Sequence, residues 1–161
     1  MRRCFWCFDF SRRGLIRLGL VAAAATLWST LVCRPMVING GSMVPTYSVH
    51  GFNFCWKPTF WFGQPRRGQV VIARYLGEEV MLLKRVVALA GDTVEFRHGR
   101  LLVNGAAVTE PYVKSGCNWN LPRRRIADGC VYLVGDNRGM PMEQHKFGEI
   151  SRRRITGVPL W

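Results

Sequence analysis

The sequence has few acidic residues and few histidines. Asp and Glu together number 10 against 23 Lys and Arg, so the formal net charge is +13 at pH 7. The three histidines show no metal-ligand spacing with the cysteines, so we expect no metal site and no cofactor. A basic excess favours an anionic partner, either nucleic acid or anionic lipid. The arginines form only short clusters, as at 123–125 and 152–154, and no nucleic-acid-binding module is recognisable. We therefore expect membrane lipid as the partner and no nucleic acid.

Long apolar runs are also scarce, with one exception near the amino terminus. Residues 14–33 are almost wholly apolar, and Arg17 is their only charge. About 20 such residues cross a bilayer core as a helix. A cleaved secretory signal would end its apolar region in small residues, whereas here the small residues 22–25 lie in the middle. An uncleaved signal-anchor is therefore favoured over a cleaved signal, and the basic residues within 1–13 place that end in the cytoplasm.

The remaining length allows one further domain with one core. We predict three parts: a basic cytoplasmic N-terminus at 1–13, a transmembrane signal-anchor helix at 14–33 and an extracytoplasmic β-rich domain at 34–161. The third part predicts a mainly β fold, a compact antiparallel sheet with partly closed barrels and no long helix. Residues 115–129 are expected to be irregular, and 76–80 to form a turn. The predicted strands are 52–56, 69–74, 80–89, 93–97, 101–103 and 130–134.

The segment Gly40-Gly41-Ser42-Met43-Val44-Pro45-Thr46 is suited to presenting a serine. Gly41 lets the backbone approach another segment closely, and Pro45 stiffens the exit. The alternative is an ordinary turn whose serine hydrogen-bonds its own backbone. Ser42 follows the apolar span by nine positions, which reach at most about 30 Å when extended. The hydroxyl is therefore expected close to the membrane surface.

The predicted strand 80–89 carries two adjacent cations among apolar residues. Side chains two apart share a face, so Lys84 and Arg85 point to opposite faces and one of them meets apolar neighbours. Burial lowers a lysine pKa and makes a neutral amine available, which arginine cannot provide. Lys84 is therefore the candidate general base. The alternative is an edge strand from which both side chains reach water.

Two further segments accompany Ser42 in the chain: Leu-Lys-Arg-Val-Val-x-Leu-x-Gly-Asp at 83–92 and Val-Gly-Asp-Asn-Arg at 134–138. Together with 40–46, and in this order, they resemble the three boxes of the signal peptidase I family, the Ser/Lys-dyad peptidases that remove signal peptides. The resemblance implies a membrane-bound serine endopeptidase with Ser42 as nucleophile and Lys84 as base. Its partners would be membrane lipid and preprotein signal peptides, with small residues at the −1 and −3 positions. No oligomeric state is predicted.

The resemblance also implies a location and a compact form. The catalytic domain would lie on the extracytoplasmic, periplasmic face of a bacterial plasma membrane. Many bacterial relatives insert a second β-region at the place of residues 115–129, for which this chain is too short. Of the aromatic residues 60–62 between two prolines, two interpretations remain, a loop that caps the core or an apolar patch in the lipid interface.

Supporting roles follow for residues around the pair. Gly41, Met43 and Pro45 would shape the serine segment. The third box, 134–138, ends a strand in a turn where Asp136 and Asn137 can bond nearby backbone amides. Asp136, Asn137 and Arg138, with Arg85, would brace the catalytic wall without taking part in the chemistry.

The sequence departs from the family pattern in two places. After the third box, Pro141 stands where many relatives have a serine that orients the lysine. Glu143 and His145 stand at the positions of an Asp and an Arg that brace the lysine region in many relatives, so both are candidate supporting residues. His145 also keeps a Ser/His alternative open, because histidine is the commonest general base. Gly40 replaces a serine that in some relatives helps to hold the oxyanion. The backbone amide of Ser42 would then carry most of that role.

Cysteines beyond the apolar span number three, so at most one disulfide can form there. We expect Cys117 to pair with Cys130 in an oxidising compartment.

Three rival functions remain open. They are a conjugative pilin-maturation peptidase of the same superfamily, a self-cleaving LexA-type protein, which the apolar span disfavours, and an inactive membrane-tethered domain that binds polypeptides.

Overall fold

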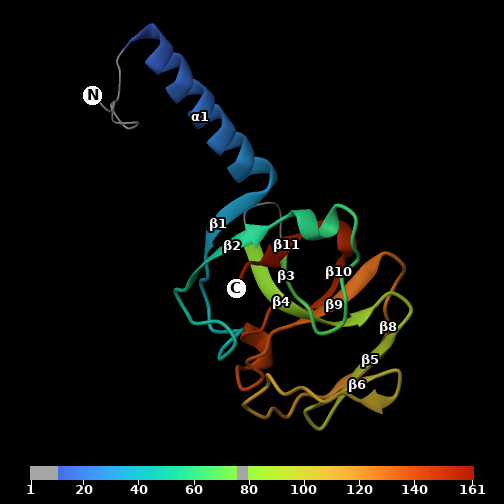
Figure 1. Ribbon diagram of the computed structural model, residues 1–161. Coiled ribbons are helices and arrows are strands. Elements are labelled where there is room, and N and C mark those ends of the chain that lie inside the picture. The colour runs from blue at the N-terminus through green and yellow to red at the C-terminus, as the bar shows by residue number, and fades with distance from the viewer. Residues whose placement is uncertain (1–10, 76–79) are drawn as a thin grey trace.

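A single long helix precedes a β domain in the computed structural model, which describes residues 11–75 and 80–161. Helix α1, Arg12–Leu31, extends away from the domain and buries none of its residues (Figure 1). It is long and apolar enough to cross a membrane, with a mean hydropathy of 1.5. The helix lies two residues earlier than predicted at each end. Ser11 caps its start by accepting a hydrogen bond from Gly14 N, and Cys33 already pairs with Trp56 in a sheet.

The β domain consists of two antiparallel sheets. The larger runs in the order β1 (Cys33–Val37), β2 (Phe52–Trp56), β11 (Ile155–Pro159), β3 (Val70–Tyr75), β4 (Val80–Leu89), β9 (Cys130–Val134), β10 (Gly148–Ser151). The smaller has β7 (Ala106–Ala107), β6 (Arg100–Val103), β5 (Thr93–Arg97) and β8 (Leu121–Arg125), and lies at the end remote from α1 (Figure 1). The predicted mainly β antiparallel class with one N-terminal helix is confirmed. Across the described residues, neither sheet closes into a barrel.

Most predicted strands are confirmed, and four of them, β2, β4, β5 and β9, have the predicted bounds. The expectation that 115–129 is irregular is wrong, because β8 pairs with β5 there. Its exposed arginines 123–125 hide the alternation of polar and apolar residues by which a strand is recognised. The predicted turn at 76–80 lies almost wholly outside the described residues, as do residues 1–10 of the predicted cytoplasmic segment.

Short 3-10 helices complete the domain, and they agree with the prediction of no long helix there. They are η1 (Pro58–Phe60), η2 (Met142–Gln144) and η3 (Arg152–Arg154). The aromatic loop, residues 60–65, begins at the end of η1. Phe60 packs against the core, whereas Trp61 and Phe62 are 55% and 99% exposed. The loop therefore caps the core with one ring and presents two to the outside.

The predicted disulfide is wrong. Cys117 and Cys130 are both free, and Cys117 Sγ instead donates a hydrogen bond to Gly99 O at 3.5 Å. Cys130 begins β9, whereas Cys117 lies beside the turn between β5 and β6. An odd number of cysteines limits how many disulfides can form, but it does not determine which two thiols lie close together.

Candidate active site

The segment that carries Ser42 is held by a buried neighbour. Met43 is 1% exposed and packs in a core cluster with Ile38, Cys55, Ile72 and Leu83. Burying a side chain of this size stabilises the fold by roughly 2 kcal/mol. Ser42 is therefore fixed at the surface of a core rather than on a free loop. Gly40, with φ +111°, provides the backbone conformation at the entry, which other residues rarely adopt.

The third box holds the same segment from the other side. Asn137 Nδ2 donates to Gly41 O at 2.9 Å, and Asn137 N donates to Ser42 O at 3.0 Å. The third box and the serine segment approach each other so closely that a Cβ atom at Gly135 would lie 2.3 Å from Ser42 O. The prediction of local amide partners for Asn137 is thus wrong, because its bonds cross to a segment about 96 residues away.

Lys84 lies on the buried face of β4 and reaches the serine. It is 2% exposed, and its Nζ donates a hydrogen bond to Ser42 Oγ at 2.5 Å. The pKa of Lys84 is lowered to about 8, because burial outweighs the opposing effect of Asp136 and Lys146 acts in the same direction as burial. A neutral amine is therefore accessible near neutral pH, and its lone pair can then accept the Ser42 proton across the same contact.

Arg85, on the other face of β4, is bound to the third box. Its Nε and Nη2 donate to the two carboxylate oxygens of Asp136 at 2.9 and 2.6 Å, and its Nη1 donates to Gly68 O. Thr46 Oγ1 also donates to Asp136, at 2.6 Å, so the fully buried carboxylate joins β4, the serine segment and the third box. These long-range partners correct the prediction that Asp136 bonds nearby amides.

Two residues that the sequence reasoning missed extend this network. The Arg85 guanidinium lies 3.8 Å from the ring centroid of Tyr112, whose hydroxyl donates to Glu110 at 2.8 Å. Glu110 in turn accepts two hydrogen bonds from buried Arg138, at 2.6 and 3.0 Å. Burial raises the pKa of Tyr112, and Glu110 adds to this. The sequence offered one indirect signal for Glu110. A buried arginine needs a carboxylate partner, and the chain has only 10 acidic residues from which that partner can come.

A groove of about 540 Å³ opens onto the Ser42–Lys84 pair. Its walls are residues 34–37 and 39–42, then Met81, Leu82 and Lys84 of β4, and also Met140, Gln144 and Lys146 from the segment around η2. Strand β4 pairs with β9 only from Arg85 onward, while β3 covers its other edge. Within the described residues, the groove-side edge of 81–84 therefore has no strand partner. An extended polypeptide can pair with such an edge.

Comparison with known proteins identifies the family of this chain. The family model for signal peptidase, peptidase S26 matches residues 12–160. The chain belongs to this family. The predicted resemblance is confirmed, and this S26 peptidase is a serine endopeptidase of the hydrolase class.

Several relatives of this S26 peptidase are bacterial proteins. A probable signal peptidase I-1 of Synechocystis sp. is 28% identical over 162 residues, covering 96% of this chain and 83% of the relative. A signal peptidase I of Leptolyngbya laminosa is 28% identical over 152 residues, covering 89% and 75%. A solved signal peptidase I from Enterococcus faecalis V583 has a TM-score of 0.48 at 23% identity, covering 60% of this chain and 97% of that one.

Among the departures from the family pattern, Gly40 lies beside Ser42 in the groove, whereas in the described part of the chain Pro141, Glu143 and His145 form no hydrogen bond with Ser42 or Lys84. Pro141 and exposed Glu143 belong to the segment around η2, and in the described part of the chain Glu143 forms no ion pair. His145 is 2% exposed and packs edge-on against Trp119, with ring centroids 5.0 Å apart. Its pKa is lowered to about 4, mainly by burial and also by the charges of Lys84 and Arg138. Within the described residues its ring nitrogens meet no hydrogen-bond partner, so it does not bond Ser42.

Proposed function

We propose that this S26 peptidase cleaves signal peptides from translocated preproteins with Ser42 as nucleophile and Lys84 as general base. The observation that carries the proposal is the Nζ–Oγ contact of 2.5 Å between a hydroxyl at the groove and a buried amine whose pKa lies at about 8. The bacterial relatives named signal peptidase I support the choice of substrate.

The proposed reaction is acyl transfer in two steps. Neutral Lys84 takes the proton of Ser42 Oγ while Oγ attacks the scissile carbonyl carbon. The proton then passes to the leaving amine, the peptide bond breaks, and an ester joins the substrate to Ser42. Lys84 next deprotonates a water molecule, which hydrolyses the ester and returns Ser42 to its starting state.

The backbone amide of Ser42 is our candidate for the oxyanion site. Gly40 has no side-chain donor, and in the described parts of the chain Ser42 N donates to no acceptor. A free amide beside the reacting carbonyl stabilises the developing negative charge. Asn137 supports this role because its two hydrogen bonds hold the carbonyl of the peptide unit that contains this amide and the carbonyl of the next peptide unit.

The substrate would bind as an added strand along residues 81–84 of β4. Its backbone would pair with the free edge of β4, and its side chains would enter the groove between Met81 and the serine segment. The remaining supporting residues, Gly41, Pro45, Arg85, Asp136 and Arg138, would act by position only. Glu143 and His145 lie outside the contacts on which this proposal rests.

We also propose that α1 anchors the enzyme in a bacterial plasma membrane. The three predicted parts, 1–13, 14–33 and 34–161, would then lie in the cytoplasm, the bilayer and the periplasm. The length and apolar composition of α1 support this, as do the basic residues before it. The exposed Trp61 and Phe62 support contact of the β domain with the lipid interface.

The test is cleavage of a labelled preprotein by the full chain in detergent. Wild type should release the mature protein, and both Ser42→Ala and Lys84→Ala should abolish release while still inserting and folding. Lys114→Ala, an exposed lysine away from the groove, is the matched control and should cleave normally. Absence of cleavage by wild type would favour the inactive polypeptide-binding alternative, and activity in Lys84→Ala would exclude this base.

A further inference from the structure

A second cleft lies between the aromatic loop and η3. Its volume is about 490 Å³, and its walls are residues 60–65, Arg152, Arg153 and Ile155. Arg152 Nη1 donates to Gln64 Oε1, which ties the loop to η3. The cleft is separate from the groove at Ser42, with which it shares no wall residue.

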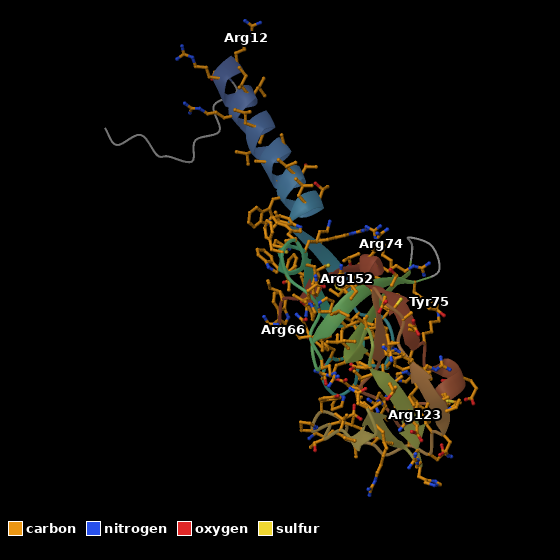
Figure 2. The ribbon with its side chains drawn as sticks, turned by 90° about the vertical axis from the view of Figure 1, so that its right-hand side faces the viewer. Arg12, Arg66, Arg74, Tyr75, Arg123 and Arg152 are labelled. Atoms are coloured by element: carbon orange, nitrogen blue, oxygen red, sulfur yellow. The ribbon has the colours of Figure 1, made fainter. Side chains whose placement is uncertain are left out.

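The cleft lies at the end of the domain where α1 enters. Lys57, directly before η1, donates from its backbone to Val32 O at 3.0 Å and from its side chain to Thr30 O. Trp28 of α1 contacts Trp56, with ring centroids 6.5 Å apart. Figure 2 shows Arg152 and Arg66 in the half of the domain next to α1, and Arg123 at the opposite end. If α1 crosses a bilayer, the cleft lies at the depth of the lipid headgroups.

The walls of the cleft combine exposed rings with uncompensated cations. Trp61 and Phe62 are 55% and 99% exposed. Residues 152–154 are exposed arginines, and none of them forms an ion pair with a carboxylate in the described parts of the chain. By contrast, nearby Arg67 is bound to Asp92. Rings beside guanidinium groups that have no carboxylate partner complement an amphiphile with an anionic head.

We propose that this cleft binds the headgroup of an anionic glycerophospholipid. The phosphate accepts hydrogen bonds from Arg152 and Arg153, and the glycerol and upper acyl carbons lie against Trp61 and Phe62. The inference rests on the membrane placement proposed above, but it does not depend on the peptidase chemistry. A lipid is favoured over an acidic polypeptide because the cleft adjoins the root of α1 and its outer rings are apolar.

The test uses the full chain in lipid nanodiscs of phosphatidylcholine with increasing phosphatidylglycerol. Hydrogen–deuterium exchange is followed in 58–66 and 150–155. We expect phosphatidylglycerol to slow exchange in both segments. Arg152→Gln/Arg153→Gln should raise the phosphatidylglycerol fraction needed for half of this protection by roughly fivefold per arginine. Arg152→Lys/Arg153→Lys keeps the charge and should retain most of the response.

The matched control is Arg123→Gln/Arg124→Gln, which removes the same charge from the remote sheet and should respond as wild type does. An unchanged response in the Arg152→Gln/Arg153→Gln protein would overturn the proposal. So would full protection in phosphatidylcholine alone, which indicates apolar insertion only. Protection by inorganic phosphate or by a soluble polyglutamate peptide in phosphatidylcholine discs would assign the cleft to free anions or to acidic polypeptides. Exchange within α1 in the same samples reports separately whether the helix is in the bilayer.

Discussion

Lys84 and Arg85 are adjacent cations on opposite faces of β4, and they differ in their partners. On one face, Arg85 is neutralised by Asp136, whose carboxylate accepts two of its hydrogen bonds. On the other, the Lys84 amine meets the Ser42 hydroxyl and, among the described residues, no carboxylate within ion-pair distance. The pKa of Lys84 falls to about 8 because burial outweighs the attraction of Asp136. Because the Asp136 carboxylate is bound to Arg85, it does not pair with Lys84, the proposed base.

The largest effect is expected when Lys84 is replaced by arginine, so that both faces of β4 carry a permanent cation. Lys84→Arg should lower kcat/KM for a preprotein by about 10³-fold or more, because a guanidinium does not release its proton to act as base. The measurement is cleavage of a labelled preprotein by full-length protein in detergent. Lys114→Arg, an exposed position, should leave the rate unchanged. Substantial activity in Lys84→Arg would show that the base is another group.

Removing the counter-charge from the Arg85 face should cost stability. Asp136→Asn leaves a largely buried guanidinium without its carboxylate, and we expect a loss of roughly 3–5 kcal/mol in the free energy of unfolding. Denaturant unfolding of the full chain in detergent measures it. Glu95→Gln breaks the exposed pair with Arg97 and should cost below ~1 kcal/mol. Equal losses in the two variants would contradict the assigned importance of Asp136.

Removing the charge from the Lys84 face should have the opposite sign. Lys84→Met should stabilise the protein by about 3 kcal/mol at pH 7, because the folded-state pKa near 8 lies below the unfolded value of 10.5. Below pH 8 the wild type carries the full cost of a buried ammonium. Between pH 8 and 10.5 its unfolded state binds the extra proton, so wild-type stability rises with pH. The gap between the two proteins should therefore narrow over that range in thermal unfolding.

The smallest expected effect concerns a charge beside the groove. Wild-type kcat/KM should rise about tenfold per pH unit up to about pH 8 and then level off as Lys84 becomes neutral. Lys146 lowers the Lys84 pKa, so Lys146→Gln should move this midpoint slightly to higher pH. Lys114→Gln removes an equal charge elsewhere and should not move it. A shift to lower pH in Lys146→Gln would contradict the electrostatic account.

The parts of the molecule that were predictable are those encoded locally. Strand β4 follows from its own apolar residues, and the proximity of Ser42 to Lys84 follows from the resemblance of their segments to the family boxes. The partners of Asp136 and Asn137 did not follow, because they lie about 51 to 96 residues away, on segments whose position relative to the third box no local pattern fixes. Glu110 and Tyr112 were missed for the same reason, since their role appears only once the fold brings Tyr112 to Arg85 and Glu110 to Arg138.

The close approach at Gly135 gives the third box a steric role in addition to its hydrogen bonds. A single added methyl group there would meet Ser42 O at 2.3 Å and His145 Cε1 at 2.6 Å. Alanine at this position should therefore displace the segment that carries Ser42, the proposed nucleophile, although no reactive group is removed. The motif at 134–138 thus keeps the turn after β9 close to the serine segment, and we expect Gly135→Ala to lower peptidase activity.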